Sequence, residues 1–154
     1  MLACDDPPDA PATLEADRHY FTPSQANRAL VLVKRIAADI VRRYARLGDL
    51  QEALDRTTGM AAEDLRGELL ETIEHLQTHL EELDDVGAEL VDWSRGIINF
   101  PARVDGRCVL LCWELGQERI TYWHEVEEGF AGRQPIETLP AAQPLAPAAA
   151  TRRS

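Results

Sequence analysis

Two long runs with apolar side chains at alternating steps of three and four residues constrain this chain more than any other feature. The first run follows the helix-start signal Phe21-Thr22-Pro23-Ser24-Gln25, where Thr22 can cap the helix, Pro23 suits its first position and Gln25 completes a capping box. Its apolar seam consists of Ala26, Leu30, Val33, Ala37, Ile40, Tyr44, Leu47 and Leu54. We therefore expect a helix from residue 22 to about residue 54.

A second run with the same spacing follows the break Arg56-Thr57-Thr58-Gly59. It predicts a helix from about Ala61 to Gly87, a glycine typical of a helix C-terminus. Its seam consists of Leu65, Leu69, Ile73, Leu76, Leu80 and Leu83. Two such helices joined by a short break pack antiparallel, which predicts a helical hairpin over residues 22–87. Because a hairpin alone has too small a core, we expect the C-terminal segment and a second copy of the protein to cover it.

Residues 88–136 have the pattern of a small antiparallel β unit. We expect extended chain at residues 89–93, a short strand at 97–100 that Pro101 stops, and a hairpin of strands 107–113 and 119–124. If Glu114 opposes Arg119, the facing pairs are Trp113 with Ile120, Leu111 with Tyr122, and Val109 with His124. The other face then carries Cys108, Leu110, Cys112, Thr121 and Trp123. The predicted fold class is α+β: a long, coiled-coil-like, antiparallel two-helix hairpin with a small C-terminal antiparallel sheet.

The composition of the two chain ends limits the bounds of the domain, and the net charge limits the kinds of partner. Residues 1–18 and 137–154 are rich in Pro and Ala without an apolar period, so we expect disordered tails around a single domain at 19–136. The net charge is −11, which argues against binding to nucleic acid. The chain has no apolar run of roughly 18 residues and begins without a secretory signal, so we expect no membrane span and a cytoplasmic location.

An ordered string of motifs extends from residue 20 to residue 135. It comprises Phe21-Thr22, Ala26-Asn27, Leu30, Gly96, Phe100-Pro101, Cys112-Trp113, Gly116, Trp123-His124 and Gly129-Phe130-Ala131-Gly132-Arg133. This string resembles a bacterial family known as domain of unknown function 2203. The resemblance implies an intracellular bacterial protein and brings no established activity. Gln117 and Asn99 stand where the family often has an acid, so any catalysis by those acids would be missing here.

The segment 108–135 holds two of the three tryptophans and two of the three cysteines, and it supplies the candidate metal ligands. Cys108, Cys112 and His124 are suitable ligand types, but the expected register turns His124 away from both cysteines. Buried cysteine acting as a small apolar side chain is the favoured interpretation. His75 and His79 are spaced for one helix face but lack a third ligand. We expect no metal and no cofactor.

General acid–base chemistry is a second interpretation of the same segment. His124, Glu125 and Glu127 leave the last strand together, and a histidine beside carboxylates has a suitable pKa range for proton transfer. Arg133 would then hold an anion. This predicts a small enzyme or anion-ligand sensor, although glutamates after a strand are common.

The loop Gly129-Phe130-Ala131-Gly132-Arg133 has two structural interpretations. Two glycines three apart can expose backbone N–H groups as an anion nest, with Arg133 as a bidentate donor. In the favoured alternative, Arg133 pairs with Glu125 or Glu127 while Phe130 fills the hairpin seam. For the tryptophans, we expect Trp113 in the core and Trp123 partly exposed.

The favoured function is non-catalytic: a cytoplasmic interaction or adaptor module that forms a homodimer through its helices. Its recognition surface would consist of Trp123, His124, Phe130 and Arg133, and it would bind a protein partner or a small anionic ligand. The alternative is the enzyme or sensor in which His124 acts with Glu125 or Glu127.

Overall fold

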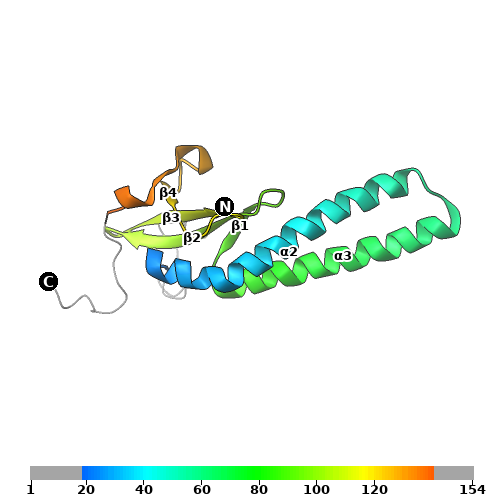
Figure 1. The fold of residues 1–154 in the computed structure, drawn as a ribbon, viewed down its shortest axis with the longest axis horizontal. Coiled ribbons are helices and arrows are strands. Elements are labelled where there is room, and N and C mark those ends of the chain that lie inside the picture. Colours follow the sequence, from blue (N-terminus) through cyan, green and yellow to red (C-terminus); the bar gives the residue numbers. More distant parts are fainter. Residues whose placement is uncertain (1–18, 141–154) are drawn as a thin grey trace, which may run out of the picture.

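The computed structural model describes residues 19–140, and the predicted α+β class is confirmed within them. Two long antiparallel helices precede a five-stranded antiparallel sheet whose spatial order follows the chain, β1-β2-β3-β4-β5 (Figure 1). The elements are α2 (Pro23–Asp55), α3 (Gly59–Val86), β1 (Glu89–Asp92), β2 (Ile97–Val104), β3 (Arg107–Glu114), β4 (Tyr122–Glu125), the 3₁₀ helix η1 (Phe130–Gly132), β5 (Gln134–Pro135) and η2 (Ile136–Thr138). The expected disorder of residues 1–18 and 141–154 falls outside the described residues.

The predicted start of the first helix is confirmed in atomic detail. Thr22 Oγ1 accepts a hydrogen bond from the backbone N–H of Gln25 at 3.1 Å, and Gln25 Oε1 accepts one from the backbone N–H of Thr22 at 2.9 Å. This reciprocal pair satisfies two donors that a helix start otherwise leaves open. At the same end of the hairpin, next to Phe21, Gly87 ends α3 in the left-handed conformation at φ 99°, which glycine adopts without strain.

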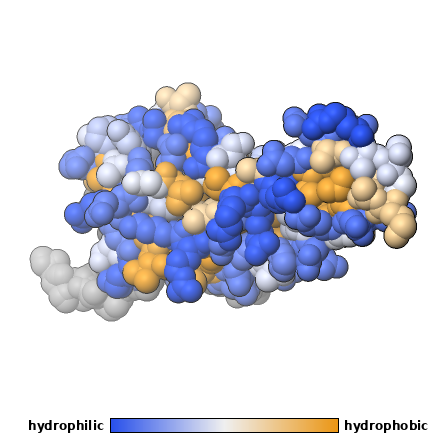
Figure 2. Space-filling model, turned by 45° about the vertical axis from the view of Figure 1, so that its right-hand side comes forward, coloured by the Kyte–Doolittle hydropathy of each residue, from blue (hydrophilic) through white to orange (hydrophobic). Residues whose placement is uncertain are grey.

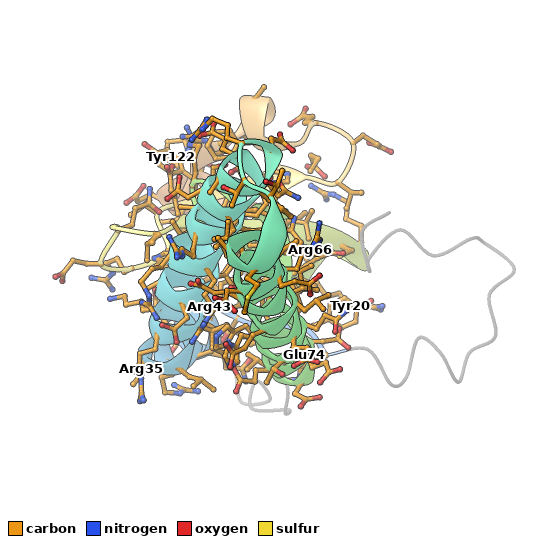
Figure 3. All side chains as sticks on the ribbon, turned by 90° about the vertical axis from the view of Figure 1, so that its right-hand side faces the viewer. Tyr20, Arg35, Arg43, Arg66, Glu74 and Tyr122 are labelled. Carbon is orange, nitrogen blue, oxygen red and sulfur yellow. The ribbon has the colours of Figure 1, made fainter. Side chains whose placement is uncertain are left out.

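One edge of the hairpin is joined by polar contacts between the helices. Arg43 Nη1 lies 2.9 Å from His75 Nδ1, and the Arg46 guanidinium donates to Glu68 at 2.8 and 3.0 Å. Figure 3 views the hairpin from its tip, with Arg43 on α2 and Glu74 on α3. These pairs are exposed and contribute little to stability, about 0–1 kcal/mol each. They do, however, mark one edge of the hairpin as polar.

The core lies between the first half of α2 and one face of the sheet. Phe21, just before the helix, and Ala26, Leu30, Val33 and Ala37 on α2 form one side, and the sheet contributes Ile98, Phe100, Ala102, Val104, Val109, Leu111, Trp113 and Trp123. The predicted core position of Trp113 is confirmed, since this side chain is fully buried. The far half of the hairpin continues beyond the end of the sheet (Figure 1).

The predicted stop at Pro101 is wrong, because β2 continues through this residue to Val104. The carbonyl oxygen of Pro101 accepts a hydrogen bond from the backbone N–H of Phe21 at 2.7 Å. In a strand, the N–H and C=O of one residue point to the same side, so the missing N–H of proline faces this side and not β3. The pairing of β2 with β3 therefore loses no hydrogen bond.

The predicted register of the last hairpin is wrong by one residue. Leu111 faces Trp123 and Leu110 faces His124. The physical cause lies in the loop before β4, where Asn27 Oδ1 on α2 accepts a hydrogen bond from the backbone N–H of Ile120 at 2.7 Å. This contact ties Ile120 to the helix, so pairing of the returning strand begins only at Tyr122.

The described fold extends slightly past residue 136. Thr138 in η2 accepts a hydrogen bond from the indole N–H of Trp123 at 3.0 Å, which joins the C-terminal turn to the sheet. Within residues 19–140, neither helix combines the length and the apolar character that crossing a bilayer requires.

Candidate functional site

The face of the sheet turned away from the helices carries the candidate site. Cross-strand pairing places Asn99, Cys112 and Tyr122 side by side in one row, and Leu110 with His124 in the next. Asn99, Cys112 and His124 are all buried, at 3%, 2% and 2% exposure. This face is therefore a second interior surface that contains polar groups.

Arg133 lies above this face between two aromatic rings. Its guanidinium carbon is 3.7 Å from the ring centre of Phe130 and 4.5 Å from that of Tyr122. Tyr122 comes from β4, and Figure 3 shows it in the β unit behind the hairpin. The Arg133 side chain forms no ion pair with any residue between 19 and 140. Stacking on two rings holds the guanidinium plane while its edges keep their hydrogen-bond donors.

A second arginine approaches the same Phe130 ring. The guanidinium carbon of Arg95, from the turn between β1 and β2, lies 5.0 Å from the Phe130 ring centre. Arg95 donates two hydrogen bonds of 3.1 Å to the carboxylate of Glu114. Of the two guanidinium groups on this ring, that of Arg95 thus pairs with a carboxylate, and that of Arg133 has no such partner in the described part of the chain.

The glycine loop before Arg133 does not form the anion nest, the less favoured of its two interpretations. The backbone N–H groups of Gly132 and Arg133 donate to the carbonyl oxygens of Gly129 and Phe130, at 3.1 and 3.2 Å. These donors are therefore used within η1. Gly132 serves close packing instead, because a Cβ there would lie 2.6 Å from Glu128 Cβ.

Two residues of the predicted recognition surface are buried. Trp123 is 4% exposed, so its predicted partial exposure is wrong. The corrected register explains this, since Trp123 faces Leu111 on the helix side of the sheet. His124 is also inaccessible, and its Nδ1 donates to the backbone carbonyl of Glu125 at 2.9 Å. Of the four predicted recognition residues, only Phe130 and Arg133 are half-exposed.

The predicted acid–base set is not brought together. The Glu125 carboxylate accepts two hydrogen bonds from Arg107, at 2.7 and 3.2 Å, which hold the pKa of Glu125 below its ordinary value. Glu127 is exposed. The favoured pairing of Arg133 with Glu125 or Glu127 is also wrong, because Arg133 stacks on aromatic rings instead.

The candidate metal ligands differ from the prediction in one respect. With the corrected register, His124 lies on the same face as Cys108 and Cys112, not on the opposite one. Burial raises the pKa of the free Cys112 thiol to about 11, and the positive charge of Arg133 offsets this only in part. Cys108 is not a free thiol. Between residues 19 and 140, no three His, Cys, Asp or Glu side chains form a group able to hold a metal ion.

The family of the chain follows from a comparison with protein-family models. The model described as "Uncharacterized conserved protein (DUF2203)" matches residues 19–136. The chain belongs to this family. The match covers the hairpin, the sheet and the Arg133 loop of this DUF2203 protein. Neither the curated proteins nor the solved structures contain a match.

Asn99 is a site residue of this DUF2203 protein that sequence reasoning noted only as a departure from the family pattern. Its Oδ1 is buried and has no hydrogen-bond partner among residues 19–140. A buried acceptor of this kind usually costs about 1–3 kcal/mol, so such positions call for an explanation. Its neighbours in the row, Cys112 and Tyr122, lead across the sheet toward Arg133.

Two further site residues had no signal in the sequence. Tyr122 falls on this face only in the corrected register, and Arg95 lies in a turn far from the loop along the chain. Their shared contact with the Phe130–Arg133 segment depends on how β1, β2 and β4 are placed, which spacing alone does not predict.

Proposed function

We propose that this DUF2203 protein is a non-catalytic interaction module that recognises an anionic group, a carboxylate or a phosphate, through Arg133. One observation carries the proposal. In a chain with a net charge of −11, a half-buried guanidinium lies against two aromatic rings and has no ion pair within residues 19–140. Side chains of this kind are typical of sites that bind a planar anion with two donors.

The neighbouring Arg95 supports this proposal from within the molecule. It contacts the same Phe130 ring and takes a carboxylate, that of Glu114, through two hydrogen bonds. A carboxylate or phosphate from a partner would accept hydrogen bonds from Arg133 in the same way. Because the rings already hold the guanidinium plane, less rotational freedom is lost when the ligand binds.

The negative net charge of the chain limits the kinds of anion that can bind to Arg133. A net charge of −11 repels polyanions such as nucleic acid along their whole length. A single carboxylate or phosphate, on a partner protein or on a small molecule, brings much less repulsion. We therefore infer that the ligand presents one isolated anionic group.

The test is a titration followed by NMR of backbone and arginine N–H groups. The probes are inorganic phosphate and a short peptide with one glutamate among neutral residues. We expect shifts confined to residues 129–134 and Tyr122, and a loss of affinity of about tenfold or more in Arg133→Gln. Arg133→Lys keeps the charge but not the planar fork, so it should recover only part of the affinity.

Arg42→Gln is the charge-matched control, because Arg42 is an exposed side chain on α2 that pairs with Asp39. It should bind both probes as the wild type does. Equal losses in Arg42→Gln and Arg133→Gln, or shifts spread over the whole surface, would contradict a site at Arg133. The relative affinities for the peptide and for phosphate distinguish the two sources of the anion.

We also propose that the protein is a homodimer through the far half of the hairpin. The half of the hairpin nearer its tip carries apolar side chains that are not fully buried: Tyr44 and Leu70 are 40% and 62% exposed, and Leu47, Leu69 and Ile73 are half-buried. We call these five residues the distal apolar front. Figure 2 shows apolar side chains along this part of the hairpin.

The charges of the two helices favour a second copy as the occupant of this front. α3 carries nine acidic side chains and one basic, whereas α2 carries six basic and four acidic. In a two-fold arrangement, α3 of one copy lies against α2 of the other, so opposite charges meet and the two acidic helices stay apart. Four helices then enclose the apolar front in a bundle.

A further inference from the structure

A pocket lies between the end of α3 and the first strand, β1. It has a volume of about 400 Å³. Its apolar lining consists of Leu80, Leu83, Ala88, Leu90 and Trp93, and its acidic lining consists of Glu81, Asp84 and Glu89. No basic side chain is among these lining residues. The pocket thus combines apolar walls with a negative rim.

The negative charge at this pocket is not compensated by the helix. Asp84 and Asp85 lie in the last turn of α3, which has no basic side chain. The C-terminus of a helix carries the negative end of its dipole, so acids there are unfavourable by about 0.3–1 kcal/mol each. Glu81 and Asp84 form no ion pair with any residue between 19 and 140, whereas Glu89 has an interaction of its own and is not needed here. A cation bound at this position would relieve the repulsion.

The aromatic wall adds a second preference for a cation. Trp93 is half-buried, and its ring centre lies 5.5 Å from that of Tyr44. A tryptophan face attracts an ammonium or guanidinium group, while the leucines suit the methylene stem that precedes it. Lysine and arginine side chains have this combination of an apolar stem and a charged end.

We propose that this pocket binds a lysine or arginine side chain presented by a partner protein. The leucines and Trp93 of the lining offer more apolar surface than a small free cation needs, which suits a side chain with a methylene stem. The acidic excess of α3 supplies the complementary charge along the approach. The molecule would then recognise groups of opposite sign at two separate places, Arg133 and the α3–β1 pocket.

The three tryptophans provide the test, because their indole N–H signals report on different places. Trp113 donates to Gln117 O at 2.9 Å and Trp123 donates to Thr138 at 3.0 Å, whereas the Trp93 N–H has no partner among residues 19–140. The probe is a short peptide of alternating leucine and lysine, titrated into the full chain. We expect the Trp93 signal to shift and saturate while the other two stay in place.

Two charge-matched double variants separate this pocket from general attraction. The double variant Glu81→Gln with Asp84→Asn should lower the affinity for the peptide about tenfold. This variant should fold normally, because the substitutions remove acids near the end of a helix. Glu71→Gln with Glu74→Gln removes the same charge from the exposed face of α3 and should change the affinity less than twofold.

Two outcomes would overturn the proposal. An equal loss of affinity in both double variants, or a Trp93 signal that does not shift, would mean that the peptide is attracted by the negative charge of the surface alone. Spermine is the second probe, and if it binds as tightly as the peptide with the same Trp93 shift, the pocket holds a small free cation rather than a partner's side chain.

Discussion

At the scale of single residues, the paired and unpaired charges of the β unit have different roles. Glu125 and Glu114 each pair with an arginine, Arg107 and Arg95, while Arg133 lies against two aromatic rings and has no ion pair among residues 19–140. Carboxylates that are occupied in this way are not available as bases, and Cys112 is a neutral thiol at physiological pH because burial raises its pKa to about 11. These two features agree with the proposed recognition of an anion by Arg133.

The Glu125–Arg107 pair gives a pH-dependent prediction. Since the pair lowers the pKa of Glu125 in the folded state, it stabilises the fold above the ordinary carboxyl pKa, and this stabilisation is lost as the pH falls through the lowered value. We expect Glu125→Gln to lower Tm slightly at neutral pH and the difference from wild type to disappear once the pH has fallen below the lowered pKa of Glu125. Thermal unfolding across this range measures it.

Glu127→Gln is the control for this pH series, because Glu127 is exposed and has no ion pair among residues 19–140. Its Tm should follow that of the wild type at every pH. A deficit in Glu125→Gln that stays constant from neutral to acidic pH would show that the carboxylate charge is not the cause.

At the scale of elements, the turn between β1 and β2 depends on Gly96. Its φ is +72°, and a Cβ there would lie 2.9 Å from Leu115 Cβ and 3.2 Å from Val41 Cγ2. We expect Gly96→Ala to reduce the free energy of unfolding by about 3 kcal/mol, because backbone strain and a clash add together. Chemical denaturation measures this change.

Gly116 separates the two contributions. Its φ is +107°, but a Cβ there meets nothing within 4 Å. Gly116→Ala should therefore cost only the backbone strain, about 1 kcal/mol. If the two variants lose the same stability, close packing of Gly96 against Leu115 and Val41 does not matter.

The helices could be predicted from sequence because their signals are local. The capping box, the seam spacing and Gly87 all act within one turn, and the structure has each in place. The register of β4 could not be predicted, because it depends on the contact between Asn27 and Ile120, residues far apart in the chain. The aromatic contacts of Arg133 follow from that register, so the candidate site was predicted only in part.

At the scale of the whole molecule, the far half of the hairpin extends beyond the sheet, where a second copy of the protein can contact it (Figure 1). Leu70 lies in the distal apolar front at 62% exposure. We expect the wild type to be a dimer and Leu70→Glu a monomer, because a carboxylate cannot be buried between two copies without a partner. Light scattering after size-exclusion chromatography measures the mass.

Val31→Glu is the matched control for the dimer. Val31 is 75% exposed on α2 and lies outside the distal apolar front. This variant should keep the mass of the wild type. A monomeric wild type, or equal dissociation in both variants, would reject an interface at this front.

The order of the strands has a consequence for how binding is acquired. Each strand pairs with its neighbour along the chain, and Arg133 immediately precedes the final strand, β5. The two rings that hold its guanidinium come from β4 and from η1, so they are in place only when the last part of the sheet is complete. If Arg133 binds an anion as proposed, a molecule shortened near this end would lose that binding, and its affinity would report whether the last part of the sheet has formed.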